Sequence, residues 1–224
     1  STALFSGGCP RSGLLWALEG LAWSGEQLPR VALILARMSK IAIDDNWANK
    51  PEGSLAAIFR SWMPQTAASL EQRERCLDLV VKHYPEVGWR LCVQQFNGRS
   101  SFGSYSHKPH WRPDGHGKGE PVTQGEMRLF PIYALDGALA WSEHTRETLG
   151  GLVEAIAQLP TAKHREVWLL VEPWSETASE DDRAALRETI RVSALSRRAR
   201  RTKGRSDAVA AAARRAKEAV ARKE

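Results

Sequence analysis

The sequence predicts an all-α protein built as an array of helical hairpins. Apolar residues recur at three- and four-residue spacing along most of the chain. Capping residues or prolines stand just before several of these apolar stretches, where helices start. The long helices expected at Pro29 and Leu70 begin about 40 residues apart, an interval typical of HEAT and armadillo repeats. A helical-hairpin array therefore accounts for all three observations.

The first two expected helices are joined by a short capping sequence. Residues 12–23 carry an apolar stripe. The members of that stripe are Leu14, Leu15, Leu18, Leu21 and Ala22. Ser24 and Gln27 have the spacing of a capping box, and Pro29 suits the first turn of the helix that follows. This second helix is apolar around more than half of its circumference, so we expect it to be largely buried.

Three further helices are expected before residue 97. Pro51 opens a short helix that ends near Trp62, and Ser69 begins a second capping box ahead of an amphipathic helix. Pro85 starts the last helix of this series, which carries apolar residues up to Phe96. Five tryptophans fall on helix stripes and are expected in the core: Trp16, Trp23, Trp62, Trp89 and Trp168.

Helical patterns resume after an irregular stretch. Thr123 and Glu126 form a third capping box, and the apolar run 167–171 is interpreted as a buried helix because its neighbours are helices. Ser179 is followed by acidic residues, which favour the first turn of a helix. The predicted organisation is N-terminal hairpins at 1–96, a loop rich in Gly, Ser, Pro and His at 97–122, C-terminal helices at 123–195 and a basic tail at 196–224.

The positive charge of the chain is concentrated at its end. Of 32 Lys and Arg and 26 Asp and Glu, 13 basic and only 4 acidic residues lie between Arg187 and Glu224, which leaves the remainder mildly acidic. Clustered arginines can neutralise phosphates, so the tail is a candidate nucleic-acid contact. Its residues are Arg197, Arg198, Arg200, Arg201, Lys203 and Arg205. The alternative is a solubilising extension, either a solvated helix or a disordered arm.

The loop at 97–122 carries the other candidate contacts. His107, His110 and His116 could converge on a metal, but structural zinc sites normally include cysteine or two ligands on a helix, so we predict no metal. The interpretation we favour is an extended segment packed across the helices and anchored by Trp111. Trp111 and Trp47 lie in loops, where an aromatic ring either pins the loop or contacts a partner. Together with His107 and His110 they are the predicted partner contacts.

Several classes of protein are disfavoured. The chain has no apolar run of membrane-spanning length, and its three cysteines include no CxxC pair, so we expect no membrane association and a reducing, cytoplasmic setting. Residues 115–119 are glycine-rich but lack the spacing of a phosphate-binding loop. No hydrolase or protease signature is present. We therefore expect neither a cofactor nor an enzymatic activity.

A resemblance accompanies these patterns. It is carried by GLLWALEGLAWS (13–24), LPRVALILARMSKI (28–41), the segment from NWANKPEG to GWRLC (46–92) and HKPHWRP (107–113). In the order of these elements the chain resembles a helical-repeat region of very large bacterial proteins. Some of those proteins carry a STAND-type NTPase module and belong to the phage-defence class. The resemblance implies a segment of a sensor or scaffold array, without ATPase activity because the nucleotide-binding motif has no counterpart here.

These observations together predict a non-catalytic helical scaffold or sensor that binds a protein partner. The alternative is a nucleic-acid-binding protein that uses the basic tail on phosphates. Neither the residues nor the resemblance identifies the partner.

Overall fold

The computed structural model of the chain describes residues 10–44, 49–97, 108–109 and 122–195. Within these ranges the regular structure is helical and no residue lies in a strand, so the predicted all-α class is confirmed. None of the described helices is long and apolar enough to cross a membrane. The chain divides into two compact units, residues 1–142 and residues 143–224. The repeat class, HEAT or armadillo, stays a prediction.

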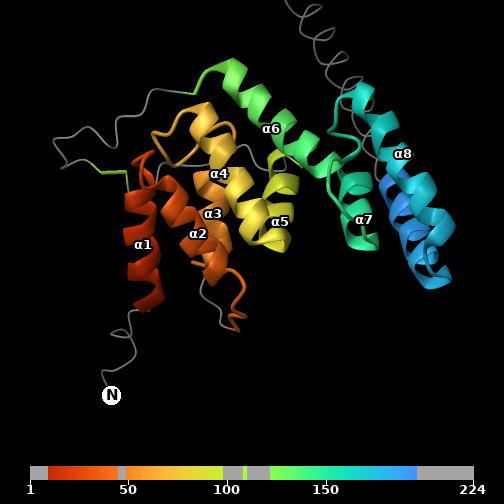
Figure 1. The fold of residues 1–224 in the computed structure, drawn as a ribbon, viewed down its shortest axis with the longest axis horizontal. Helices are drawn as coiled ribbons and strands as arrows, with labels where there is room; N and C mark the ends of the chain where they lie inside the picture. Colours follow the sequence, from red (N-terminus) through yellow and green to blue (C-terminus); the bar gives the residue numbers. More distant parts are fainter. Residues whose placement is uncertain (1–9, 45–48, 98–107, 110–121, 196–224) are drawn as a thin grey trace, which may run out of the picture. The chain divides into compact units, whose positions relative to one another are not determined.

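The first unit contains six labelled helices (Figure 1). Their bounds are α1 Pro10–Ala22, α2 Leu28–Met38, α3 Pro51–Ile58, α4 Leu70–His83, α5 Pro85–Phe96 and α6 Gln124–Leu139. Helix α2 packs against α1, α3 and α4, and α4 packs against α5, so α1 to α5 form one layer. Helix α6 lies across α5 and α4. The first unit extends to Ser142 and includes α6, which packs against α5 and α4.

The core of the first unit is built from the inward faces of these helices. It is dominated by aliphatic side chains, and its aromatic members are Trp23, Phe59, Phe96 and Phe130. The rings of Phe59 and Phe130 stack with centroids 6.2 Å apart, which joins the end of α3 to the middle of α6. Arg73 is also inside this core, where only 1% of it is exposed.

Two of the predicted capping boxes are confirmed. Ser69 accepts from the Gln72 amide at the start of α4 while the Gln72 side chain accepts from the Ser69 amide, and Thr123 and Glu126 do the same for α6. The box predicted at Ser24 is wrong. Its carbonyl accepts from the Gln27 and Leu28 amides in a turn, and α2 begins only at Leu28, without a side-chain cap.

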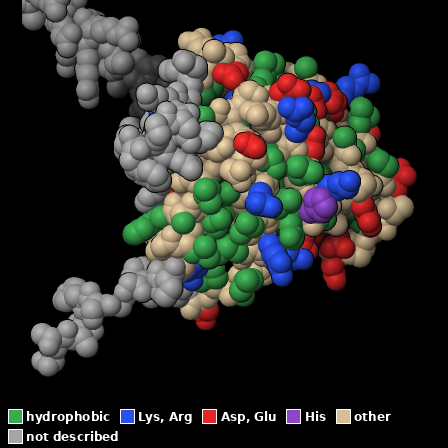
Figure 2. Space-filling view, turned by 60° about the vertical axis from the view of Figure 1, so that its left-hand side comes forward, with side chains coloured by type: hydrophobic (Ala, Val, Ile, Leu, Met, Phe, Trp, Pro, Cys, Tyr) green, Lys and Arg blue, Asp and Glu red, His purple; other side chains and the backbone are tan. Residues whose placement is uncertain are grey.

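Helix α1 buries only part of its apolar stripe. Leu15, Leu18 and Ala22 are buried, but Leu14 and Leu21 are 50% and 43% exposed. Trp16, predicted to be core, is 48% exposed, whereas Trp23 is buried and the other three predicted core tryptophans are half-buried. The neighbours of α1 in the structure are α2 and α3, which together cover only one side of a short helix. In Figure 2 the molecule is turned so that the side carrying α1 in Figure 1 comes forward, and hydrophobic side chains are exposed on that face.

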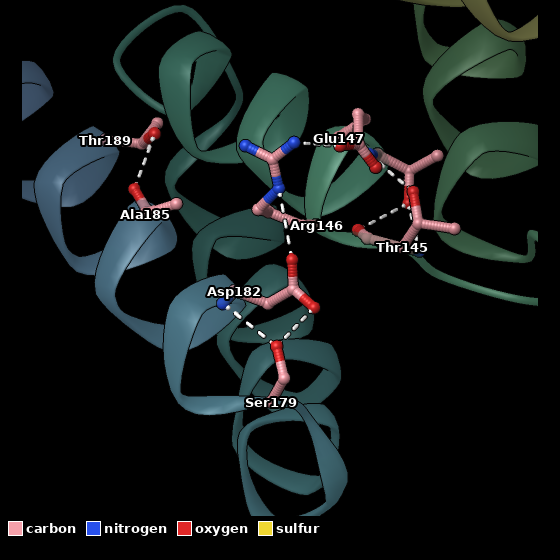
Figure 3. Close-up of polar contacts among 8 residues, drawn as sticks. Thr145, Arg146, Glu147, Ser179, Asp182, Ala185 and Thr189 are labelled. Carbon is pink, nitrogen blue, oxygen red and sulfur yellow. Dashed lines mark hydrogen bonds and ion pairs between the residues drawn. The ribbon is translucent and has the colours of Figure 1, made fainter.

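The second unit contains α7 (Arg146–Ala155), α8 (Thr161–Thr177) and a further helix over 180–195. Helix α8 includes the run 167–171, so the predicted helix is confirmed, although Leu169 within it is 53% exposed. Arg146 Nε lies 3.3 Å from Asp182 Oδ1, and the Ser179 hydroxyl accepts from the Asp182 amide (Figure 3). This contact ties the first turn of α7 to the first turn of the last helix. The cap on α7, Thr145, was not predicted.

Candidate functional site

The predicted contact residues lie outside the described residues. This holds for Trp47, Trp111, His107 and His110, and for the tail residues Arg197, Arg198, Arg200, Arg201, Lys203 and Arg205. Of the irregular stretch between α5 and α6, the pair Lys108 and Pro109 is described and half-buried. Lys108 Nζ lies 5.0 Å from the centroid of the Trp23 ring, a cation–π distance. Lys108 thus contacts the residue that directly follows α1.

The described cysteines are not reactive groups. Burial raises the pKa of the Cys76 thiol to about 12, and burial with the nearby Asp78 charge raises the pKa of Cys92 to about 12. Both thiols are therefore protonated near neutral pH and pack as small apolar groups. No group of three or more His, Cys, Asp and Glu within the described ranges is placed to hold a metal ion.

One polar pair joins α6 to α4 at the surface. The Tyr133 hydroxyl donates to Asp78 Oδ2 over 2.6 Å. Partial burial, followed by this hydrogen bond and the Asp78 charge, raises the pKa of Tyr133 well above its ordinary value. A phenol held in its neutral form is a poor base and nucleophile at neutral pH. The pair is best understood as a cross-link between the two helices.

A described surface that combines apolar and basic side chains lies on α2. This helix buries Leu28, Val31, Ala32, Leu35 and Ala36 against its neighbours. The same helix also has apolar residues on its outer face, because Leu33 is half-buried and Ile34 is 39% exposed. The sequence therefore led us to expect a largely buried helix, but the structure leaves one apolar side of it uncovered by the described residues.

That side of α2 forms one wall of a groove. Pro29, Arg30, Leu33, Ile34 and Arg37 line it from α2, and Tyr84 lines it from the junction between α4 and α5. We call this the α2 groove; its volume is about 430 Å³. Tyr84 is placed there because α4 ends at His83 and Pro85 begins α5, so the chain turns at this residue. Tyr84 also lines a smaller hollow of about 110 Å³, together with Lys40 and Glu86.

The charge on the rim of the α2 groove is positive and uncompensated by the described residues. Arg30 and Arg37, which line the groove, are exposed and form no ion pair or hydrogen bond with a described side chain. Other arginines of the first unit are paired, for example Arg75 with Glu71 at 3.3 Å and Arg90 with Glu52 at 3.0 Å. An apolar floor with a rim of cations that lack partners fits a binding surface.

Sequence reasoning missed the α2 groove for a physical reason. Its second wall comes from Tyr84, about fifty residues after the α2 side chains, and only the fold brings them together. One local signal was available: Arg30 and Arg37 are seven residues apart and so share a face of the helix with Ile34. Charged residues on that face show that it points to solvent, yet it carries apolar side chains as well.

Comparison of the chain with protein-family models, with characterised proteins and with solved structures found no match.

Proposed function

We propose that this chain is a non-catalytic helical module that binds a protein partner through the α2 groove. One observation carries the proposal: Leu33 and Ile34 form an open apolar floor between two arginines that have no charge partner among the described residues. Apolar patches rimmed by polar groups are typical of protein–protein contact sites. A helical scaffold supplies a rigid wall for such a contact, because the side chains that face the groove are fixed by the buried face of the same helix.

The setting of this module is also part of the proposal. The resemblance to helical-repeat regions of large bacterial defence proteins supports a role as a sensor or scaffold segment within such a protein. A cytoplasmic location is supported by the buried free thiols of Cys76 and Cys92, which are typical of a reducing compartment.

The proposed function predicts that ligands selected without bias will use the α2 groove. A displayed library of random peptides would be selected against the purified chain, and affinities measured by fluorescence anisotropy. Ile34→Asp places a charge on the apolar floor and is expected to lower the affinity of the chain for the selected peptides by at least about tenfold. Ile34 is part-exposed, so the substitution leaves the core intact.

Leu129→Asp on α6 is the matched control, because Leu129 is 54% exposed and lies outside the groove. Binding should survive this change. Failure to select any peptide, or selection of peptides that respond equally to both substitutions, would count against the α2 groove as the binding site.

The second candidate function is nucleic-acid binding by the basic tail, supported by the excess of Lys and Arg after residue 187. A labelled DNA duplex is expected to bind the full chain with an affinity that falls steeply with salt. A chain that ends at Leu195, the last residue of the described helix, should lose this binding. Equal binding by both chains would rule out the tail as the phosphate contact, and absence of binding at low salt would dismiss the function altogether.

A further inference from the structure

We propose that the occupant of the α2 groove is an acidic amphipathic helix contributed by the partner. This inference rests on the proposed function and specifies the chemistry of the ligand. It is built from three features of the groove: the spacing of its cations, the volume of its apolar floor and the absence of a strand edge beside it.

The two arginines set the charge pattern of the ligand. Arg30 and Arg37 are separated by two turns of α2, which is about 10 Å along the axis at the usual helical rise. Carboxylates seven residues apart on a second helix have the same spacing. Each arginine is exposed and forms no ion pair with a described carboxylate, so a ligand carboxylate breaks no such pair when it binds. A basic ligand would meet repulsion at both ends of the groove.

The floor between the arginines sets the apolar pattern. Leu33 and Ile34 lie three and four residues after Arg30, and Tyr84 stands opposite them. A cavity of about 150 Å³ admits a benzene-sized group. The groove volume of about 430 Å³ therefore accommodates two aliphatic side chains. On a ligand helix these anchors fall at the third and fourth positions after the first carboxylate, on the same face as both carboxylates.

A helix fits the groove better than an extended segment does. An extended peptide gains much of its affinity by adding a strand to a sheet edge, and the described part of this chain has no strand. A helix satisfies its own backbone hydrogen bonds and presents only side chains to the groove. The ligand is thus a helix with Glu or Asp at two positions seven apart and two aliphatic residues between them.

The test uses a labelled synthetic helix with Glu at positions i and i+7 and Leu at i+3 and i+4. A comparison peptide of otherwise identical sequence carries Lys in place of both Glu residues. We expect the full chain to bind the Glu peptide at least about tenfold more tightly than the Lys peptide at low salt, with a difference that shrinks as salt rises. The double variant Arg30→Glu/Arg37→Glu should reverse this preference and bind the Lys peptide instead.

The reversal is the informative readout, because a variant that merely misfolded would bind neither peptide. Arg128→Glu on α6 is the matched control, since Arg128 is also exposed but does not line the groove. The control should keep the preference for the Glu peptide. Equal affinity of the wild-type chain for both peptides would overturn the charge assignment. A central proline breaks a helix, so a Glu peptide that carries one and still binds as tightly as its parent would overturn the conclusion that the ligand is helical.

The same proteins and peptides also test two other possible occupants of the groove, a second copy of the chain and a nucleic acid. Sedimentation of the chain alone would reveal a second copy in the groove if it showed self-association that Arg30→Glu/Arg37→Glu abolishes. Displacement of the Glu peptide by a DNA duplex would instead identify a general polyanion site. Either result overturns the acidic-helix ligand. If the Glu peptide fails while library-selected peptides still respond to Ile34→Asp, the proposed function stands and only this inference falls.

Discussion

Replacing Arg73 by alanine is expected to lower the free energy of unfolding by about 3 kcal/mol, because it empties space in the core and removes the buried partner of the part-exposed Glu126. Arg73 is 1% exposed, and its Nη2 lies 3.5 Å from Glu126 Oε1. Its Cζ lies 5.2 Å from the centroid of the Phe130 ring. The side chain therefore links α4 to the first turn of α6 and to the aromatic core.

The charge of Arg73 is poorly compensated. Its Nε and Nη1 have no hydrogen-bond partner among the described residues. Burial lowers the pKa of the guanidinium, while the charges of Glu126 and Glu74 oppose that shift. An arginine remains protonated in proteins even so, and the desolvation penalty offsets much of the attraction to Glu126. We infer that the stem of Arg73 contributes more to stability than its charge does.

Arg73→Met tests this inference, because methionine retains an unbranched stem but carries no charge. Its free energy of unfolding is expected to stay within about 1 kcal/mol of wild type. Urea unfolding followed by far-ultraviolet circular dichroism would compare the two variants. If Met is as destabilising as Ala, the ion pair with Glu126 is the larger contribution and the packing explanation is wrong.

Capping boxes and the all-α class could be predicted because their causes are local. Ser69 and Thr123 each bond to a residue three positions later, so the whole motif is contained in four letters of sequence. Ser24 shows the limit of this reasoning. The same letters fit a turn in which the serine carbonyl, not its side chain, accepts the amides, and Ser24 is buried there. A capping pattern alone does not separate these two cases.

The faces of the helices could not be predicted as well as their existence. Leu14, Leu21 and Trp16 are as apolar as the buried residues of α1, and only the positions of α2 and α3 determine which side is covered. Ile34 belongs to a helix that its composition predicts to be largely buried, yet it is 39% exposed. The α2 groove also depends on Tyr84, which lies about fifty residues after the α2 side chains in the sequence, so a periodic pattern within one helix cannot reveal their contact. Hydrophobic periodicity identifies a helix, but it does not tell which distant part of the chain packs against which face of that helix.

Gly88→Ala is expected to lower the free energy of unfolding by about 1–3 kcal/mol, although alanine is the better helix former. A Cβ added to Gly88 would lie 2.6 Å from Val81 Cα and 2.9 Å from Val81 Cγ2. The nearer atom belongs to the backbone of α4, so no rotamer change can relieve the contact. Helices α4 and α5 must separate, and the loss of packing exceeds the gain of about 1 kcal/mol in helix propensity.

Gly137→Ala supplies the comparison that isolates the contact with Val81. Gly137 lies within α6, and an added Cβ there meets no atom within 4 Å. This variant is expected to raise the free energy of unfolding by about 0.5–1 kcal/mol through helix propensity alone. Opposite signs in urea unfolding would establish that α4 and α5 touch through backbone at Gly88. Stabilisation by both variants would show that the two helices can move apart without loss.

The same substitution bears on the binding surface. Tyr84 stands at the turn between α4 and α5, four residues before Gly88, and forms the wall of the α2 groove opposite α2. Forcing the two helices apart at Gly88 displaces this turn, so Gly88→Ala should also weaken binding of the Glu peptide. Gly137→Ala, remote from the groove, should leave that affinity unchanged. A Gly88→Ala chain that is destabilised but binds with unaltered affinity would show that Tyr84 is positioned by α2 rather than by the α4–α5 hairpin.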